Sequence, residues 1–220
     1  MEISHISETE YSIKGIYLSD LLNKGYCAFD FEATGANQEE EHITQIGAVI
    51  IENNQILVDK GFSCFVKSPK SNPELIEKLT GIKNSDIERA PSFPEVYKKF
   101  NEFIKQNVLI TQAGYEFDWL LLRTECERNN LPMITNTILD TKVLFSYLHP
   151  EVQERISTNF LINFYKVDDS DIKRHDALGD SVLIARIFMK LLDEFKQRKI
   201  NDVIINEPII VKKVQLTPLS

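Results

Sequence analysis

The chain has 220 residues, a formal net charge of −8, and an ordinary balance of 43% hydrophobic and 26% charged residues. This length and composition predict one globular domain with a substantial core and short extensions, and no apolar run approaches the roughly 18–20 residues of a membrane span. The acidic balance argues against a tight, non-specific binder of duplex DNA, because such proteins neutralise many phosphates with basic side chains.

The first part of the chain is rich in short apolar runs. Residues 16–23 are compatible with a short helix that stops at Gly25. Three later runs are predicted to be strands because they are apolar and are bounded by turn-forming residues; they cover residues 26–31, 43–51 and 56–66. The polar cluster at 52–55 suggests that the last two of these strands form a hairpin.

The rest of the chain predicts helices that alternate with short strands. Ser92 is a candidate N-cap for a helix over 93–105, whose apolar residues recur at helical spacing. Further helices are expected at 74–79, 116–128 and 176–197, and further strands at 108–111 and 138–140. A hairpin followed by this alternation favours an α/β domain with a mixed sheet.

We place the domain at residues 25–198, between an N-terminal extension of residues 1–24 and a C-terminal tail of residues 199–220. Two apolar pieces of the tail, 203–205 and 209–211, are compatible with edge strands, with a partner-binding segment or with disorder. The sequence alone leaves these three alternatives open.

The cysteines and the N-terminus bear on cellular location. Cys27, Cys64 and Cys126 are isolated, odd in number and without CxxC spacing, which argues against a disulfide framework or a zinc site. The first residues also lack the charged-then-apolar layout of a signal peptide. A reducing, cytoplasmic location without a membrane partner is therefore expected.

Acidic residues and one histidine recur in three segments that suit metal-dependent chemistry. They are Asp30 with Glu32, then Asp118, and finally His175 with Asp180. A single carboxylate binds Mg²⁺ weakly, because the ion keeps most of its waters. Four carboxylates gathered in one place would hold two ions, and two metals about 3.5–4 Å apart can hold both oxygens of a phosphodiester displacement. The pattern predicts a nuclease.

Local geometry supports cooperation within the first segment. Residues two apart on a strand point to the same face, so Asp30 and Glu32 project together while Phe29 and Phe31 face the packed side. The alternative is a strand that simply ends in solvated acids before a turn.

The other two segments involve predicted helices. Asp118 is expected at the start of an apolar helix, where an acid can equally be a favourable partner of the helix dipole. Residues five apart differ by about 140° around an α-helix, so His175 and Asp180 cannot share one helical face. We therefore expect His175 just before the final helix, Asp176 as its N-cap, and Asp180 in its second turn.

The order and spacing of these motifs resemble those of the DEDDh exonucleases, also called the DnaQ-like 3′–5′ exonucleases. The resemblance runs from about Tyr26 to about Phe195, and the flanking segments HITQIGAVII, LTGIKNSDI and ILDT fit it as well. It implies a ribonuclease H-like fold, with a five-stranded mixed sheet flanked by helices.

The resemblance also implies roles for the site residues. Asp30, Glu32, Asp118 and Asp180 would hold two ions, Mg²⁺ or Mn²⁺, which the all-oxygen ligand set favours. Glu32 and His175 would be catalytic, with His175 taking the proton of the attacking water. The substrate would be the 3′ end of single-stranded or frayed DNA or RNA, and the products nucleoside 5′-monophosphates.

Contacts to the 3′-terminal nucleotide are implied by the same resemblance, at Phe31, Ala33, Thr34, Gly35 and Thr80. The alternative at the last position is that Leu79 packs while Thr80 and Gly81 simply close a helix. Basic residues are candidates for phosphate contacts or for solvated surface charges; they are Lys83, Arg123, Lys142, Lys173 and Arg174.

One segment departs from the family. Where relatives have a strand ending in Ala-His-Asn, this chain has Thr111 and Gln112 in place of the histidine and asparagine. Those residues lie near the substrate in relatives and are not metal ligands, so the departure concerns substrate preference and rate. It also motivates an alternative function, a non-catalytic member that acts as a regulatory or protein-interaction module. A polymerase or another protein is a candidate partner.

Overall fold

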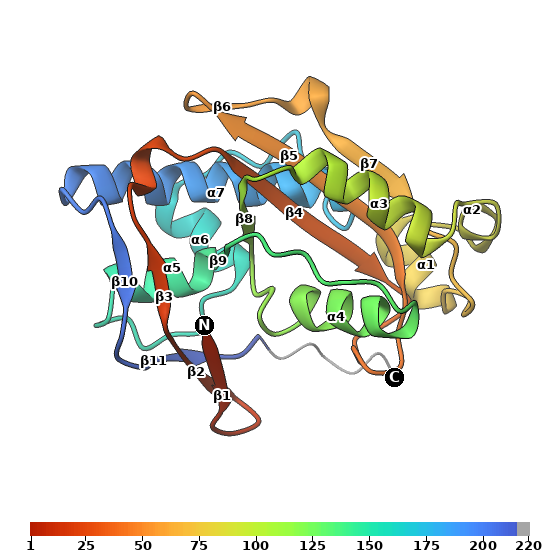
Figure 1. Ribbon diagram of the computed structural model, residues 1–220, viewed down its shortest axis with the longest axis horizontal. Helices are drawn as coiled ribbons and strands as arrows, with labels where there is room; N and C mark the ends of the chain where they lie inside the picture. Colours follow the sequence, from red (N-terminus) through yellow and green to blue (C-terminus); the bar gives the residue numbers. More distant parts are fainter. Residues whose placement is uncertain (215–220) are drawn as a thin grey trace.

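A computed structural model describes residues 1–214 of the protein. At its centre lies a mixed sheet with the strand order β6-β5-β4-β8-β9, and β7 also pairs with β5 (Figure 1). The strands are β4 Tyr26–Ala33, β5 Ile43–Glu52, β6 Gln55–Ile56, β7 Phe62–Phe65, β8 Val108–Thr111 and β9 Ile138–Asp140. β5 runs antiparallel to β4, whereas β8 runs parallel to both β4 and β9. The predicted α/β class with a mixed sheet is confirmed.

The third predicted strand, over 56–66, is interrupted. The 3-10 helix η2, Val58–Lys60, separates β6 from β7. Both short strands pair with β5, on the edge opposite β4. The sheet therefore keeps five strand positions although six strands contribute to it.

Helices cover both faces of the sheet (Figure 1). They are α1 Glu74–Thr80, α2 Asn84–Glu88, α3 Phe93–Ile104, α4 Asp118–Arg128, α5 Thr141–Leu148, α6 Thr158–Tyr165 and α7 Ala177–Gln197. The ring of Phe100 on α3 lies 6.0 Å from that of Phe31, and the ring of Phe188 on α7 lies 4.6 Å from that of Tyr26. Alternate β4 residues thus face α3 and α7, which leaves Asp30 and Glu32 on the α7 face.

The helix ends follow from local sequence. Ser92 begins α3 as predicted, because its backbone N–H donates to Glu95 at 2.9 Å in a capping box. Asp176 caps α7, since its side chain accepts from the backbone N–H of Gly179 at 3.1 Å. The apolar faces of α3 and α7 then pack on the sheet, and full burial of one Phe contributes about 1.5–3 kcal/mol.

The predicted helix over 16–23 is wrong. This segment forms a strand, β3 Ile16–Leu18, followed by the 3-10 helix η1, Leu21–Asn23. β3 is extended because it pairs with β10, Val203–Ile205, almost 190 residues later in the chain. Local sequence contains no sign of that pairing.

Both ends of the described chain meet in a second sheet. β2, Glu10–Lys14, pairs with β1, Glu2–His5, on one side and with β11, Ile209–Lys212, on the other. The tail pieces at 203–205 and 209–211 are therefore strands, while tail residues 215–220 lie outside the described residues. Ile13, Val203 and Val211 are buried in the same core as the central sheet, so the terminal strands pack directly on the domain.

Two further findings concern membrane-spanning helices and the cysteines. No helix within residues 1–214 is long and apolar enough to cross a bilayer. Cys27, Cys64 and Cys126 are free thiols.

Candidate active site

Four carboxylates converge on one cavity of about 1100 Å³. Asp30 and Glu32 come from β4, Asp118 is the first residue of α4, and Asp180 lies in the first turn of α7, one turn earlier than predicted. Carboxylate oxygens of Asp30, Glu32 and Asp180 all lie within 4.8 Å of one another. Asp118 lines the same cavity, as does His175. The structure thus brings together the five residues that the three motifs contribute.

The cluster is electrostatically costly without cations. Burial raises the pKa of Glu32 to about 8 and that of Asp118 to about 7. The pKa of Asp30 is raised well above its ordinary value, first by burial and then by the charges of Asp118, Asp180 and Glu32. Carboxylates that repel one another in a cavity, with oxygen as their only donor atom, fit hard divalent cations such as Mg²⁺ or Mn²⁺.

The segment before α7 brings the histidine to the site. His175 precedes the helix, as predicted, and it is exposed, with a left-handed φ of 58°. Its backbone N–H donates to Asp180 Oδ2 at 2.7 Å, and Arg174 Nε donates to Asp180 Oδ1 at 2.8 Å. The backbone of His175 therefore orients Asp180, a candidate metal ligand, while His175 itself lines the cavity.

A glycine that the motifs did not single out makes this arrangement possible. Gly47 on β5 lies directly opposite Asp30. A Cβ at Gly47 would lie 2.1 Å from the backbone carbonyl carbon of Ala177, so the start of α7 rests directly on this strand. Gln45 secures the same contact by accepting from the Ala177 backbone N–H at 3.1 Å. A glycine inside the apolar run HITQIGAVII is the sequence signal for such a close approach.

We expect Gly47→Ala to displace the start of α7 and to weaken the site. The new methyl group would meet backbone atoms, which cannot rotate away, so the free energy of unfolding should fall by about 1–3 kcal/mol. Denaturant unfolding and a Mn²⁺ titration of the folded variant would measure both effects. Wild-type stability and metal affinity would show that α7 does not depend on this contact.

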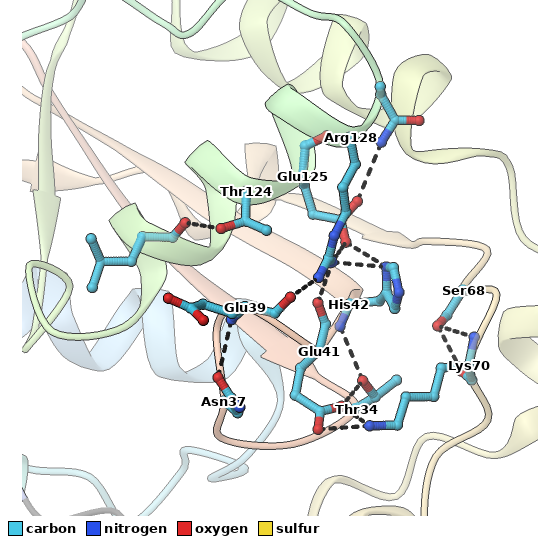
Figure 2. Close-up of polar contacts among 12 residues, drawn as sticks. Thr34, Asn37, Glu39, Glu41, His42, Ser68, Lys70, Thr124, Glu125 and Arg128 are labelled. Carbon is cyan, nitrogen blue, oxygen red and sulfur yellow. Dashed lines mark hydrogen bonds and ion pairs between the residues drawn. The ribbon is translucent and has the colours of Figure 1, made fainter.

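A polar network holds the loop between β4 and β5 (Figure 2). The hydroxyl of Thr34 donates to the carboxylate of Glu41, and Lys70 Nζ donates to both oxygens of that carboxylate at 2.7 Å. On the other side of the loop, Arg128 donates to the backbone carbonyl of Glu41 and, at 3.0 Å, to the buried carboxylate of Glu125. The loop is thereby tied to the turn before α1 and to the end of α4.

This network matters for the site because it joins two elements that hold carboxylates of the cluster. α4 begins with Asp118, and the loop directly follows the strand of Asp30 and Glu32. His42, at the end of the loop, also contacts Glu125, with its Nδ1 2.7 Å from Oε1 (Figure 2). Hydrogen bonds between α4 and the loop therefore fix the position of Asp118 relative to Asp30 and Glu32.

The residues implied as substrate contacts differ in their placement. Phe31, Ala33, Gly35 and Thr80 line the cavity, although the ring of Phe31 packs against Phe100 in the core. Thr34 is buried outside the cavity lining, where its hydroxyl serves the network above. The Thr80 hydroxyl donates to the carbonyl of Ile76, and Gly81 ends α1 with a φ of 77°, so these two residues do close a helix. Their substrate roles stay predictions.

Comparison with known proteins decides the family. Residues 27–188, most of the chain, match the RNase_T family, described as an exonuclease. The chain belongs to this exonuclease family. The four acids and the histidine are those expected of the DnaQ-like, DEDDh members of this exonuclease family. The predicted resemblance is confirmed, and the acidic cluster agrees with the dependence of the family on divalent metals.

Curated relatives of the exonuclease are much longer proteins. A DNA polymerase III PolC-type from Caldanaerobacter subterraneus subsp. tengcongensis is 32% identical over 94% of this chain. A DNA polymerase III PolC-type from Mycoplasma genitalium is 25% identical, also over 94%. The chain spans only 14% of the length of either relative.

Solved structures support the ribonuclease H-like fold. The nuclease domain of 3′hExo, a DEDDh family member solved bound to rAMP, superposes with a TM-score of 0.70 at 22% identity. The superposition covers 86% of this chain and 99% of that domain. The predicted ribonuclease H-like α/β fold is confirmed by this likeness.

The departure from the family motif has a structural consequence in this exonuclease. The hydroxyl of Thr111 donates a hydrogen bond to Asp118 Oδ2 at 3.1 Å, so Thr111 orients a candidate metal ligand. Gln112 is buried, where it accepts from the hydroxyl of Thr141. Both replacements therefore leave the carboxylate cluster in place.

One candidate phosphate contact is wrong. Lys142 is fully buried, and its ammonium group pairs with the carboxylate of Glu116. A lysine without exposed surface cannot reach a nucleic acid, so the charge of this residue is paired inside the domain instead. Arg123 and Arg174, in contrast, line the cavity.

The metal-free exonuclease should lose stability as pH rises. Because the pKa values of Asp30, Glu32 and Asp118 are raised in the folded state, that state binds more protons than the unfolded chain between about pH 4 and pH 8. The free energy of unfolding therefore decreases with pH in this window. Thermal melts in EDTA at pH 5.5 and pH 8 would show the trend, and saturating Mg²⁺ should reduce it. A pH trend that Mg²⁺ does not change would contradict the prediction.

Proposed function

We propose that the chain removes nucleoside 5′-monophosphates stepwise from the 3′ end of single-stranded or frayed nucleic acid, with two divalent ions and His175 as the general base. The observation that carries the proposal is the convergence of four acids from β4, α4 and α7 on one cavity that His175 also lines. Buried carboxylates that lack cations are destabilising, so their gathering is best explained by metal binding.

The residues divide the chemistry between them. Asp30, Glu32, Asp118 and Asp180 would hold Mg²⁺ or Mn²⁺. When bound, two such ions offset the charge that gathers on the phosphate and on the leaving oxygen. His175 is exposed at the cavity, where it would accept the proton of the attacking water. Thr111 and the backbone of His175 keep two of the carboxylates oriented.

The remaining predictions concern substrate and setting. A net charge of −8 favours an end-trimming enzyme, which needs few phosphate contacts, over a protein that binds duplex tightly through many phosphates. Because the matched relatives are PolC-type polymerases of which the chain spans a small part, a polymerase is the proposed partner. The free thiols agree with the proposed cytoplasmic location.

The departure at Thr111 and Gln112 supports a second candidate, a non-catalytic module that keeps the fold for protein interaction. Against it stand the four acids, which all line the cavity together with His175. A module without catalysis would have no physical need for mutually repelling buried carboxylates.

A nuclease assay separates the two candidates. Short 5′-labelled DNA and RNA strands with free 3′ ends, incubated with Mn²⁺, should yield a ladder of shortened products and free nucleoside 5′-monophosphate. EDTA and Asp118→Asn should each remove the ladder. Absence of any ladder, with no difference between wild type and His175→Ala, would favour the non-catalytic module.

A further inference from the structure

We propose that the terminal strands extend the substrate site, and that Lys213, supported by His5, binds a backbone phosphate of the substrate strand upstream of the bond that is cut. The inference rests on the proposed nuclease function and adds a contact outside the carboxylate cluster. Both residues line the same cavity as Asp30 and Asp180.

The size of the cavity leaves room for such a contact. Its volume of about 1100 Å³ exceeds the range of roughly 300–1,000 Å³ that is usual for a site holding one drug-sized ligand. The lining continues from the carboxylates to Met1 and to Ile3 and His5 of β1. A substrate longer than its terminal nucleotide would therefore lie along the second sheet.

The contacts of Lys213 leave its charge available. Its Nζ lies 2.7 Å from Nδ1 of His5 and 3.2 Å from the backbone carbonyl of Ser7. An ammonium group only donates, so Nδ1 of His5 accepts and the ring carries its proton on Nε2. Within residues 1–214, no carboxylate lies within ion-pair distance of Lys213. One N–H of Lys213 and the Nε2–H of His5 thus remain for an anion.

The nearby carboxylate of Glu116 makes no close ion pair with this lysine. Glu116 already pairs with the buried ammonium group of Lys142, and it also accepts from the backbone N–H of Val214 at 2.6 Å. Lys213 therefore makes no close ion pair with Glu116, although its charge acts on that carboxylate at longer range. Because the protein is acidic overall, such a cation would help to draw a phosphate along this wall toward the carboxylates.

The chain offers a matched control at the neighbouring position. Lys212 is exposed, and its ammonium group contacts the backbone carbonyl of Gln153. It has the same charge as Lys213 but does not line the cavity. Replacing either lysine by methionine removes one positive charge from the same part of the surface, so a difference between the two variants reports position and not net charge.

The test compares two substrates in the full chain. One is a 5′-labelled single-stranded decamer, and the other is the p-nitrophenyl ester of thymidine 5′-monophosphate, which has no upstream phosphate. Lys213→Met should raise KM for the decamer about two- to fivefold, the effect of one exposed ion pair. The slope of log KM against log salt should fall by about 0.7. Ester hydrolysis and the thermal midpoint should not change.

Two further variants sharpen the comparison. Lys213→Arg should restore most of the decamer KM because it keeps the charge, whereas Lys212→Met should behave as wild type. Equal decamer KM values and salt slopes for Lys213→Met and Lys212→Met would overturn the inference and leave the proposed function intact. A loss of ester hydrolysis together with a lower thermal midpoint would overturn it as well, because it would show that Lys213 only holds the terminal strands.

Failure of the proposed function gives a different result. In that case wild type would cleave neither substrate with Mn²⁺. Decamer binding, followed by fluorescence anisotropy in Ca²⁺ at several salt concentrations, then tests Lys213 without turnover. A smaller salt slope for Lys213→Met than for Lys212→Met supports the phosphate contact, and equal slopes overturn it.

Discussion

Asp30→Asn is expected to lower nuclease activity by at least about 10³-fold while it raises the stability of the metal-free protein. Activity is lost because Asp30 lies at the centre of the cluster, with carboxylate oxygens of Glu32 and Asp180 within 4.8 Å. Stability rises because the substitution removes one charge from a group of acids whose pKa values are raised by burial and mutual repulsion.

The two effects of Asp30→Asn are measured separately. Turnover of a labelled strand with Mn²⁺ measures the first, and thermal melts in EDTA measure the second, with about 2–4 °C expected for each kcal/mol gained. Asp193→Asn, at an exposed position of α7, is the matched control and should change neither quantity. A sharp fall in metal-free stability would show that Asp30 is structural, and the metal site would lose its main support.

His175→Ala should lower kcat by about 10²–10⁴-fold, the usual contribution of a general base. The fold and the metal affinity should be kept, because the ring is exposed and the contact to Asp180 is made by the backbone N–H. Steady-state kinetics with Mn²⁺, a thermal melt and a Mn²⁺ titration would establish this pattern.

A second variant separates the ring of His175 from its backbone. His175 has a left-handed φ of 58°, a conformation that asparagine tolerates better than most residues. His175→Asn should therefore keep the loop geometry and lose activity as His175→Ala does, and added imidazole should restore part of the rate in both. Wild-type kcat in either variant would exclude this histidine as the base.

The elements that local sequence specifies were predicted well. Alternation on β4 places Asp30 and Glu32 on one face, and helical periodicity with a capping residue identifies α3 and α7. These features depend on a few neighbouring residues, so they are visible without any knowledge of the fold. The same reasoning placed Asp118 at the start of a helix over 116–128, and α4 begins at Asp118 itself.

Elements held by distant contacts were predicted poorly. β3 is a strand only because β10 pairs with it, and η2 interrupts what local propensity presents as one strand. Lys142 looked like a surface cation, yet it lies fully buried against Glu116. In each case a tertiary contact outweighed a local preference, which amounts to a fraction of a kcal/mol per residue.

By itself, the sequence identified the four acids and the histidine that form the candidate site, and the kind of element on which each one lies. Only the tertiary structure decided how these residues meet, through the contact of α7 with Gly47 and the bonds of Arg128 to the loop after β4. It also decided that the two ends of the described chain bring His5 and Lys213 to the same cavity. The physical reason is the distance along the chain between the residues that interact. Spacing along the chain governs the direction of neighbouring side chains, whereas convergence of distant segments depends on packing of the whole core.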